Sequence, residues 1–147
     1  MPALKATIAS LADDAEFGAG ADQGRLAAAE AKLGIVIPSA LREFLKEADG
    51  VRCDHGAGVV WPVQKIESEN LAFRSNPAFR ELYMPFDGLL FFAADGGGDQ
   101  FAFAVHADGK IHKHDVFRWE HESDARTWFA TGLDDYVAKR LSESYYD

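Results

Sequence analysis

The sequence predicts an α+β fold, with N-terminal helices followed by an antiparallel β-sheet and a C-terminal helix packed on that sheet. In the first third of the chain apolar residues such as Leu41 and Phe44 recur at helical spacing. From Gly88 onward, short apolar runs bounded by turn residues are typical of strands. Near the end, Leu133 and Tyr136 return to helical spacing. Because helices come first and strands follow, the class is α+β.

The N-terminal helices are predicted from apolar spacing and from residues that start or stop a helix. One helix falls near Leu4 to Leu11, and a second spans residues 25–33. Residues 35–38 form a short extended joint, because proline disfavours α-helical backbone in the residue before it. Ser39 is expected to cap a third helix, which ends at residues 49–50.

The middle of the chain has a less regular pattern. Residues 56–66 resemble an interrupted strand, in which Pro62 fits best at an edge or a bulge. Residues 67–74 are expected to form a short helix, and residues 76–85 are less regular.

The expected sheet begins with residues 89–94, which are apolar on both faces as in a central strand. Residues 101–105 form the next strand, and a tight turn at residues 107–109 follows. Residues 110–122 then hold one long or bulged strand. Regular alternation along that strand makes Trp119 a core residue.

The start of the last helix has two interpretations. Periodicity alone allows it to begin at Ser123, since Ala125, Trp128 and Leu133 roughly share one face. In the alternative, residues 123–126 form a turn, residues 127–130 form a short strand, and the helix begins near Thr131.

Length and charge limit the possible functions. The 147 residues are long enough for one domain spanning 1–147, and the formal net charge is −9, from 15 basic and 24 acidic residues. Direct nucleic-acid binding is disfavoured, because it normally needs a basic surface. An acidic surface favours solubility and can also steer a basic protein partner. The N-terminus shows neither a signal peptide nor a membrane span, so we expect a cytoplasmic protein.

The glycine-rich segment is the most conspicuous motif, and its residues are Asp95, Gly96, Gly97, Gly98 and Asp99. It differs from a phosphate-binding loop, because no Gly-Lys-Ser/Thr sequence follows and its two carboxylates would repel a phosphate. Calcium usually needs about six or more oxygen ligands, and the acidic spacing of an EF-hand is absent. We therefore interpret the segment as a structural turn whose aspartates accept hydrogen bonds from loop amides.

Two histidines on the expected strand 110–122 are candidate metal ligands. On a strand, His112 and His114 point to the same face, and a third ligand could come from His106 or Asp115. The neighbouring lysines oppose a cation, so a solvent-facing polar strand is the preferred interpretation. We predict no cofactor and no metal.

Catalytic motifs are scarce in the chain. Cys53 is the single cysteine, and His55 lies two residues away, which raises the possibility of an activated thiol. Residues two apart in a loop rarely reach the required geometry. The sequence therefore predicts a protein that is not an enzyme.

Several short motifs follow one another along the chain: Glu30-x-x-Leu33-Gly34, Ile37-Pro38, Leu41-x-x-Phe44-Leu45, Asp49-Gly50, Phe91-Phe92, Asp95 to Asp99, Phe101-x-Phe103 and Trp119 to Asp124. Their order and spacing resemble those of the Smi1/Knr4 (SUKH) family. The resemblance covers about residues 26–141, and its departures, such as Asp49 for the usual asparagine, are chemically mild. It also favours the interpretation in which the last helix begins near Thr131.

The resemblance implies an α+β domain with no established enzymatic chemistry. Many bacterial members of the family resemble immunity proteins, which bind and neutralise a cognate toxin, often a nuclease. Eukaryotic relatives resemble regulatory interaction modules, so a cytoplasmic regulatory or scaffold module with an endogenous partner is the alternative. For a basic toxin domain, the candidate contact residues are the carboxylates expected to be exposed, Asp54, Glu67, Glu69 and Asp87.

Overall fold

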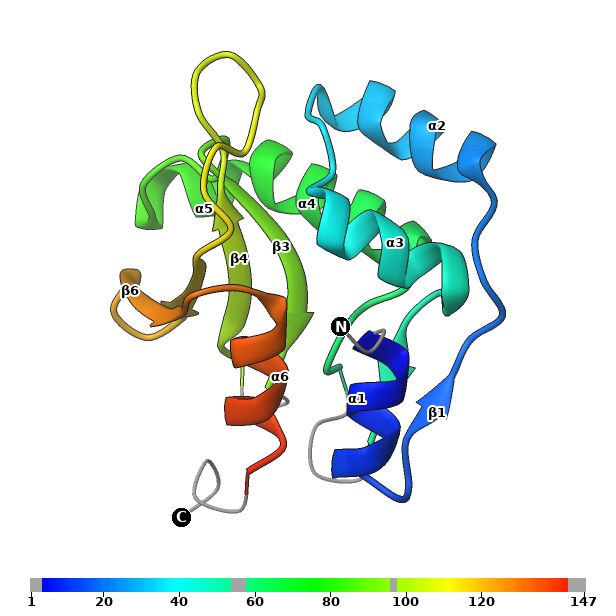
Figure 1. The fold of residues 1–147 in the computed structure, drawn as a ribbon. Helices are drawn as coiled ribbons and strands as arrows, with labels where there is room; N and C mark the ends of the chain where they lie inside the picture. Colours follow the sequence, from blue (N-terminus) through cyan, green and yellow to red (C-terminus); the bar gives the residue numbers. More distant parts are fainter. Residues whose placement is uncertain (1–3, 54–57, 96–97, 143–147) are drawn as a thin grey trace.

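A four-stranded antiparallel sheet occupies the C-terminal half of the computed structural model, which describes residues 4–53, 58–95 and 98–142 (Figure 1). The strands are β3 (Leu89–Ala94), β4 (Gln100–Ala104), β5 (Val116–Glu120) and β6 (Ala125–Ala130). Their order in the sheet, β3-β4-β5-β6, follows the chain. Each strand therefore pairs with its neighbour in sequence, and β3 and β6 are the two edges.

Helices pack on both faces of this sheet. The helices of the described residues are α1 (Leu4–Leu11), α2 (Gln23–Leu33), α3 (Ser39–Glu47), α4 (Val63–Ser75), α5 (Pro77–Leu82) and α6 (Leu133–Arg140). Helix α4 packs on β3 and on α2, while α6 packs on β6 and on α1 (Figure 1). A small antiparallel ribbon of β1 (Glu16–Phe17) and β2 (Val51–Arg52), which the sequence did not predict, lies beside α1. The predicted α+β class is thus confirmed.

The ends of the N-terminal helices show which local signals decide their boundaries. The Asp22 carboxylate accepts a hydrogen bond of 2.7 Å from the backbone N–H of Arg25 and caps α2, which ends at Gly34 with a φ of 67°. The expected capping by Ser39 is wrong. Pro38 occupies the N-cap of α3 without a side-chain hydrogen bond, and Ser39 is the first helical residue.

The segment expected as an interrupted strand is mostly not a strand. Val60 forms only an isolated bridge with Val51, and α4 already begins at Val63, while residues 56–57 lie outside the described part of the chain. Pro62 is the N-cap of α4 instead of an edge-strand residue. Proline at a helix start is favourable because its fixed φ and missing N–H do no harm there.

Two further expectations need correction around the sheet. Residues 76–85 contain a regular helix, α5, which begins at Pro77 with Asn76 as its N-cap. The strand expected over residues 110–122 is much shorter, since β5 begins only at Val116 and residues 105–115 form a loop before it. At the last helix the turn interpretation is confirmed, with β6 preceding α6.

Asn70 attaches the edge strand β3 to α4. Its side chain is buried, accepts a hydrogen bond of 2.8 Å from the backbone N–H of Phe91, and donates one of 2.8 Å to the Phe91 carbonyl. The amide also donates to the Ile66 carbonyl of its own helix at 2.6 Å. On the side of β3 that has no neighbouring strand of the sheet, Asn70 thus supplies the bonds that a strand would make.

Aromatic side chains form one cluster on each face of the sheet. Because successive strand residues point to opposite faces, Phe91 and Phe92 belong to different clusters. The closed cluster, beneath α6, consists of Phe92, Phe101, Phe103, Phe129 and Tyr136. The open cluster, beneath α5, consists of Phe73, Phe79, Tyr83, Phe86, Phe91 and Trp119. The predicted core position of Trp119 is confirmed by its burial.

Within the residues that the structure describes, we find no helix with the length and apolar composition needed to cross a lipid bilayer.

Candidate partner-binding site

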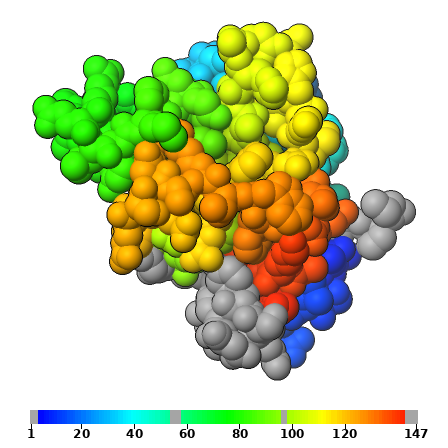
Figure 2. Space-filling view, turned by 90° about the vertical axis from the view of Figure 1, so that its left-hand side faces the viewer, coloured from blue at the N-terminus to red at the C-terminus, as the bar shows by residue number. Residues whose placement is uncertain are grey.

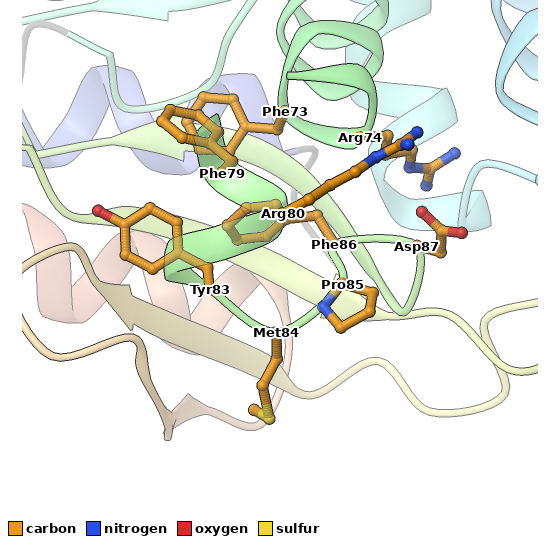
Figure 3. Close-up of a pocket in the computed structure, with 9 residues that line it drawn as sticks. All are labelled: Phe73, Arg74, Phe79, Arg80, Tyr83, Met84, Pro85, Phe86 and Asp87. Carbon is orange, nitrogen blue, oxygen red and sulfur yellow. The ribbon is translucent and has the colours of Figure 1, made fainter. Parts of the chain in front are cut away.

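A hollow of about 370 Å³ opens on the outer side of the open cluster (Figure 3). It lies between the end of α4, α5 and the loop that leads into β3. The lining residues are Phe73, Arg74, Phe79, Arg80, Tyr83, Met84, Pro85, Phe86 and Asp87. Four rings contribute to its wall together with two arginines and one aspartate, so the hollow presents both apolar and charged groups.

Helix α5 holds one wall of this pocket although none of its residues is buried. Its start is determined locally: the Asn76 side chain accepts a hydrogen bond of 2.9 Å from the backbone N–H of Ala78, and Pro77 follows the cap. The ring of Phe79 packs edge-on against Phe73 at 5.0 Å between centroids. In the space-filling view, the α5 region (green) projects from the body of the molecule beside β6 (orange) (Figure 2).

The loop after α5 is tied to the β5–β6 turn by several hydrogen bonds. Tyr83 donates its hydroxyl to the His121 carbonyl at 3.2 Å, and the Met84 N–H donates to Asp124 at 2.9 Å. Arg126 donates to the Met84 and Pro85 carbonyls at 2.8 and 3.1 Å. The pocket wall is thus positioned by residues far away in the sequence.

The two arginines of the pocket have different environments. Arg74 donates to the Leu33 carbonyl at 2.9 Å and to the Leu89 carbonyl at 3.2 Å. Burial lowers the pKa of its guanidinium, and the nearby Asp87 carboxylate acts in the opposite direction. Arg80 is exposed, and among the described residues no carboxylate lies within 4.0 Å of it. Arg74 is therefore a structural residue, whereas Arg80 is free to meet a ligand.

An exposed apolar side chain, Met84, lines the pocket. Met84 is 57% exposed, and Leu82, the last residue of α5, is 70% exposed; these are the two highest values among the large hydrophobic residues that the structure describes. In the close-up, Met84 points away from the ring cluster and outward (Figure 3). Exposed apolar groups beside a hollow are typical of a contact surface.

The predicted contact carboxylates lie in different surroundings. Asp87 is exposed and lines the pocket, and Glu69 is half-buried on α4. The expectation that Glu67 is exposed is wrong: it is buried on α4 and forms ion pairs with Arg25 at 3.3 Å and Lys32 at 3.7 Å on α2. Asp54 lies outside the described residues. Of the three carboxylates that the structure describes, only Asp87 is exposed.

The glycine-rich segment is linked to β5 and the turn after it through Asp99. The Asp99 carboxylate accepts hydrogen bonds from Arg118 at 2.7 Å and from the His121 ring at 2.6 Å. Burial acts to raise the pKa of Asp99, but the hydrogen bonds from His121 and Arg118 together outweigh burial and lower it. At Gly98, whose φ is 109°, a Cβ atom would lie 2.8 Å from the His121 ring. Gly96 and Gly97 lie outside the described residues, and the structural role of the segment stays a prediction.

Arg118 also lies 3.6 Å from the other aspartate of the segment, Asp95.

The histidines considered as metal ligands lie in the loop before β5, so the strand geometry expected for them is wrong. His112 contacts Asp108 at 2.8 Å, and its ring packs edge-on against His106. In the described ranges no group of three or more His, Cys, Asp or Glu side chains is arranged to hold a metal ion. Cys53 is buried, while His55 lies outside those ranges.

Sequence reasoning missed the pocket itself. The available signals were Asn76-Pro77, which is a good helix start, and the apolar Leu82 and Met84 in a segment without a buried periodicity. Asn70, an amide in the middle of a helix, was a similar signal for a buried polar contact.

Together, the helix-covered antiparallel sheet and the pocket define an α+β fold with a hollow on its surface. The family model described as SUKH_6, SMI1-KNR4 cell-wall, matches residues 23–137. The chain therefore belongs to the SMI1-KNR4 (SUKH) family, as its motifs indicated. A search of curated proteins found no match.

Proposed function

We propose that this protein is a non-enzymatic, cytoplasmic immunity protein that binds and neutralises a cognate toxin, with a basic, nuclease-type domain as the favoured partner. Membership of the SMI1-KNR4 family over residues 23–137 is the observation that carries the proposal. A pocket lined by aromatic rings and by the exposed Met84 supports protein binding as the mode of action.

Inhibition would be steric and electrostatic. The net charge of −9 attracts a basic toxin and raises the rate of association. Once bound, the domain covers the toxin surface that its substrate needs. Of the predicted contact residues, Asp87 is the best candidate to attract a basic partner, because it is exposed and lines the pocket.

The proposal is tested by capturing a tagged copy on resin from native-host lysate, at low and at high salt, with mass spectrometry of what co-purifies. We expect a basic toxin domain that is lost at high salt, because screening weakens charge attraction. The purified toxin should then lose its activity when the domain is added. A captured toxin that keeps full activity would contradict neutralisation.

A second candidate is a regulatory or scaffold module with an endogenous partner. The description of the matching family refers to the cell wall, which favours a role in growth or morphology. This candidate predicts that deletion of the gene changes growth or cell shape in the absence of any toxin. The immunity proposal predicts a silent deletion until toxin is expressed.

A further inference from the structure

We propose that the hollow beneath α5 is a binding site for a small aromatic carboxylate. The rings of the lining hold the aromatic body of this ligand, and Arg80 binds its carboxylate. A small molecule can fill the hollow with or without a protein partner, so this site goes beyond the proposed function and does not depend on it.

The hollow has the size and the division of groups that suit such a ligand. Its volume is about 370 Å³, and small-molecule sites typically have volumes of roughly 300–1,000 Å³. Figure 3 shows Phe73, Phe79 and Tyr83 at one end, and the guanidinium groups of Arg74 and Arg80 at the other. A molecule with a ring at one end and an anionic group at the other matches both ends.

The ring end of the hollow has apolar surface left to cover. Phe73, Phe79 and Tyr83 are half-buried, so part of each ring still faces water. These rings already pack edge to face, as Phe79 does with Phe73 at 5.0 Å and 69°, and with Tyr83 at 5.4 Å and 66°. An incoming ring can extend this arrangement, and it removes the remaining apolar surface from water.

The charges of the lining favour an anion. Among the described residues that line the hollow, Arg74 and Arg80 stand against a single carboxylate, that of Asp87. The Asp87 charge acts on Arg74, because it opposes the lowering of the Arg74 pKa by burial. Arg74 also directs two of its nitrogens to backbone carbonyls. Arg74 and Asp87 therefore offset each other, and the charge of Arg80 remains.

Arg80 is placed to bind the carboxylate of the ligand. Its side chain is exposed, and no carboxylate of the described residues lies within 4.0 Å of it. The next residue, Glu81, is not among the described residues of the lining, as expected because successive helix residues point about 100° apart. A planar guanidinium can donate two parallel hydrogen bonds to one carboxylate.

The first test is an NMR titration of isotope-labelled wild-type protein with 3-phenylpropionate. We expect amide shifts between residues 73 and 87, with a dissociation constant on the order of 1 mM for a ligand of this size. 3-Phenylpropylamine has the same ring and the opposite charge, and should bind at least about 5-fold more weakly. Propionate, which lacks the ring, should cause no shifts at these residues.

These probes can overturn the proposal without any variant. An amine that binds as tightly as the acid would exclude an anionic ligand. Propionate that binds as tightly as 3-phenylpropionate would exclude a role for the rings. An acid that shifts no signals, or only signals outside residues 73–87, would exclude the site.

The second test assigns the carboxylate to Arg80. Arg80→Ala should bind 3-phenylpropionate about 5-fold more weakly than wild type, because an exposed ion pair is lost. Arg52→Ala removes another exposed arginine, on β2, and is the control that should bind like wild type. Arg80→Lys keeps the charge without the planar fork and should fall between wild type and Arg80→Ala. Equal binding by wild type and Arg80→Ala, or an equal loss in both alanine variants, would reject Arg80 as the contact.

The Asp87→Asn variant tests the balance of charge. Because the opposing carboxylate is gone, this variant should bind 3-phenylpropionate about 2- to 3-fold more tightly than wild type at low salt. It should bind 3-phenylpropylamine more weakly. Weaker binding of the acid by Asp87→Asn would contradict an anionic ligand.

Failure of this site can be told apart from failure of the proposed function, because the probes are small molecules and the protein is pure. A domain that binds none of the probes rejects the site and leaves the immunity proposal to the capture experiment. A domain that binds the acid but captures no toxin retains the site and rejects the immunity proposal.

Discussion

The two aromatic clusters of this protein are built from similar residues on one sheet, yet one of them is covered more completely than the other. In the closed cluster, Phe92, Phe103 and Tyr136 are almost completely buried, and the Tyr136 hydroxyl donates to the Val59 carbonyl while accepting from Arg140 at 2.7 Å. In the open cluster, Phe79 and Tyr83 are only half-buried and line a pocket.

The difference lies in the covering helix. Helix α6 buries Leu133, Tyr136, Val137 and Arg140 against the sheet, whereas α5 buries none of its residues. A sealed aromatic cluster contributes mainly to folding. An unsealed one keeps apolar surface available, so its rings can contribute to binding instead.

The sharpest test of this comparison is truncation of one ring in each cluster. Phe92→Ala removes a fully buried ring stacked 4.8 Å from Phe103 and should lower the free energy of unfolding by about 3–5 kcal/mol. Phe79→Ala removes a half-buried ring and should lower it by only about 1–2 kcal/mol, because water already reaches that site. Urea denaturation measures both values. Equal losses would break the distinction between the clusters.

Removal of the Asn70 amide should have the next largest effect. Asn70→Ala removes the side-chain amide that hydrogen-bonds the backbone N–H and carbonyl of Phe91, a residue of the open cluster. Each buried group left unsatisfied costs about 1–3 kcal/mol, so we expect a loss of roughly 2–4 kcal/mol in urea denaturation. Hydrogen exchange should show the Phe91 amide losing protection before that of Phe103. Uniform loss over both strands would argue against a local attachment.

The Asp99 network supports the turn that holds Tyr83, and its contribution should depend on pH. Asp99→Asn should reduce the free energy of unfolding by about 1–2 kcal/mol at pH 5, because charge-assisted bonds from Arg118 and His121 are weakened.

The net lowering of the Asp99 pKa in the folded state means that ionisation favours folding. This stability is present above the unfolded pKa of about 3.9 and is lost as the pH falls through the folded value. The gap between wild type and variant should therefore shrink from pH 5 toward pH 3 in urea titrations. A gap that widens in acid would contradict the lowered pKa.

The smallest expected effect on stability belongs to two exposed apolar side chains, Leu82 at the end of α5 and Met84 in the pocket lining. Leu82→Glu and Met84→Glu should change the free energy of unfolding by no more than about 0.5 kcal/mol, since both side chains are mostly exposed. Thermal denaturation measures this directly. A large loss of stability would show that α5 seals its cluster more tightly than its exposure indicates, and would remove the contrast with α6.

The amino-acid sequence alone determined the features that depend on neighbours a few residues apart. The helix expected over residues 25–33 is observed as α2, and the apolar run 89–94 is observed as β3. These segments form where predicted because apolar periodicity, Gly34 and short apolar runs act locally. The order of the family motifs could also be found from the sequence, because it depends only on the order of residues along the chain.

Only the tertiary structure decided which side chains are exposed and which meet. Nothing in the sequence near Glu67 indicates that its side chain is buried. It is buried because α2 packs beside it, and Arg25 and Lys32 of α2 form ion pairs with its carboxylate. The pocket depends on contacts between Tyr83 and His121, which are 38 positions apart. Local patterns contain no information about such partners, because burial and pairing depend on what the rest of the chain places nearby.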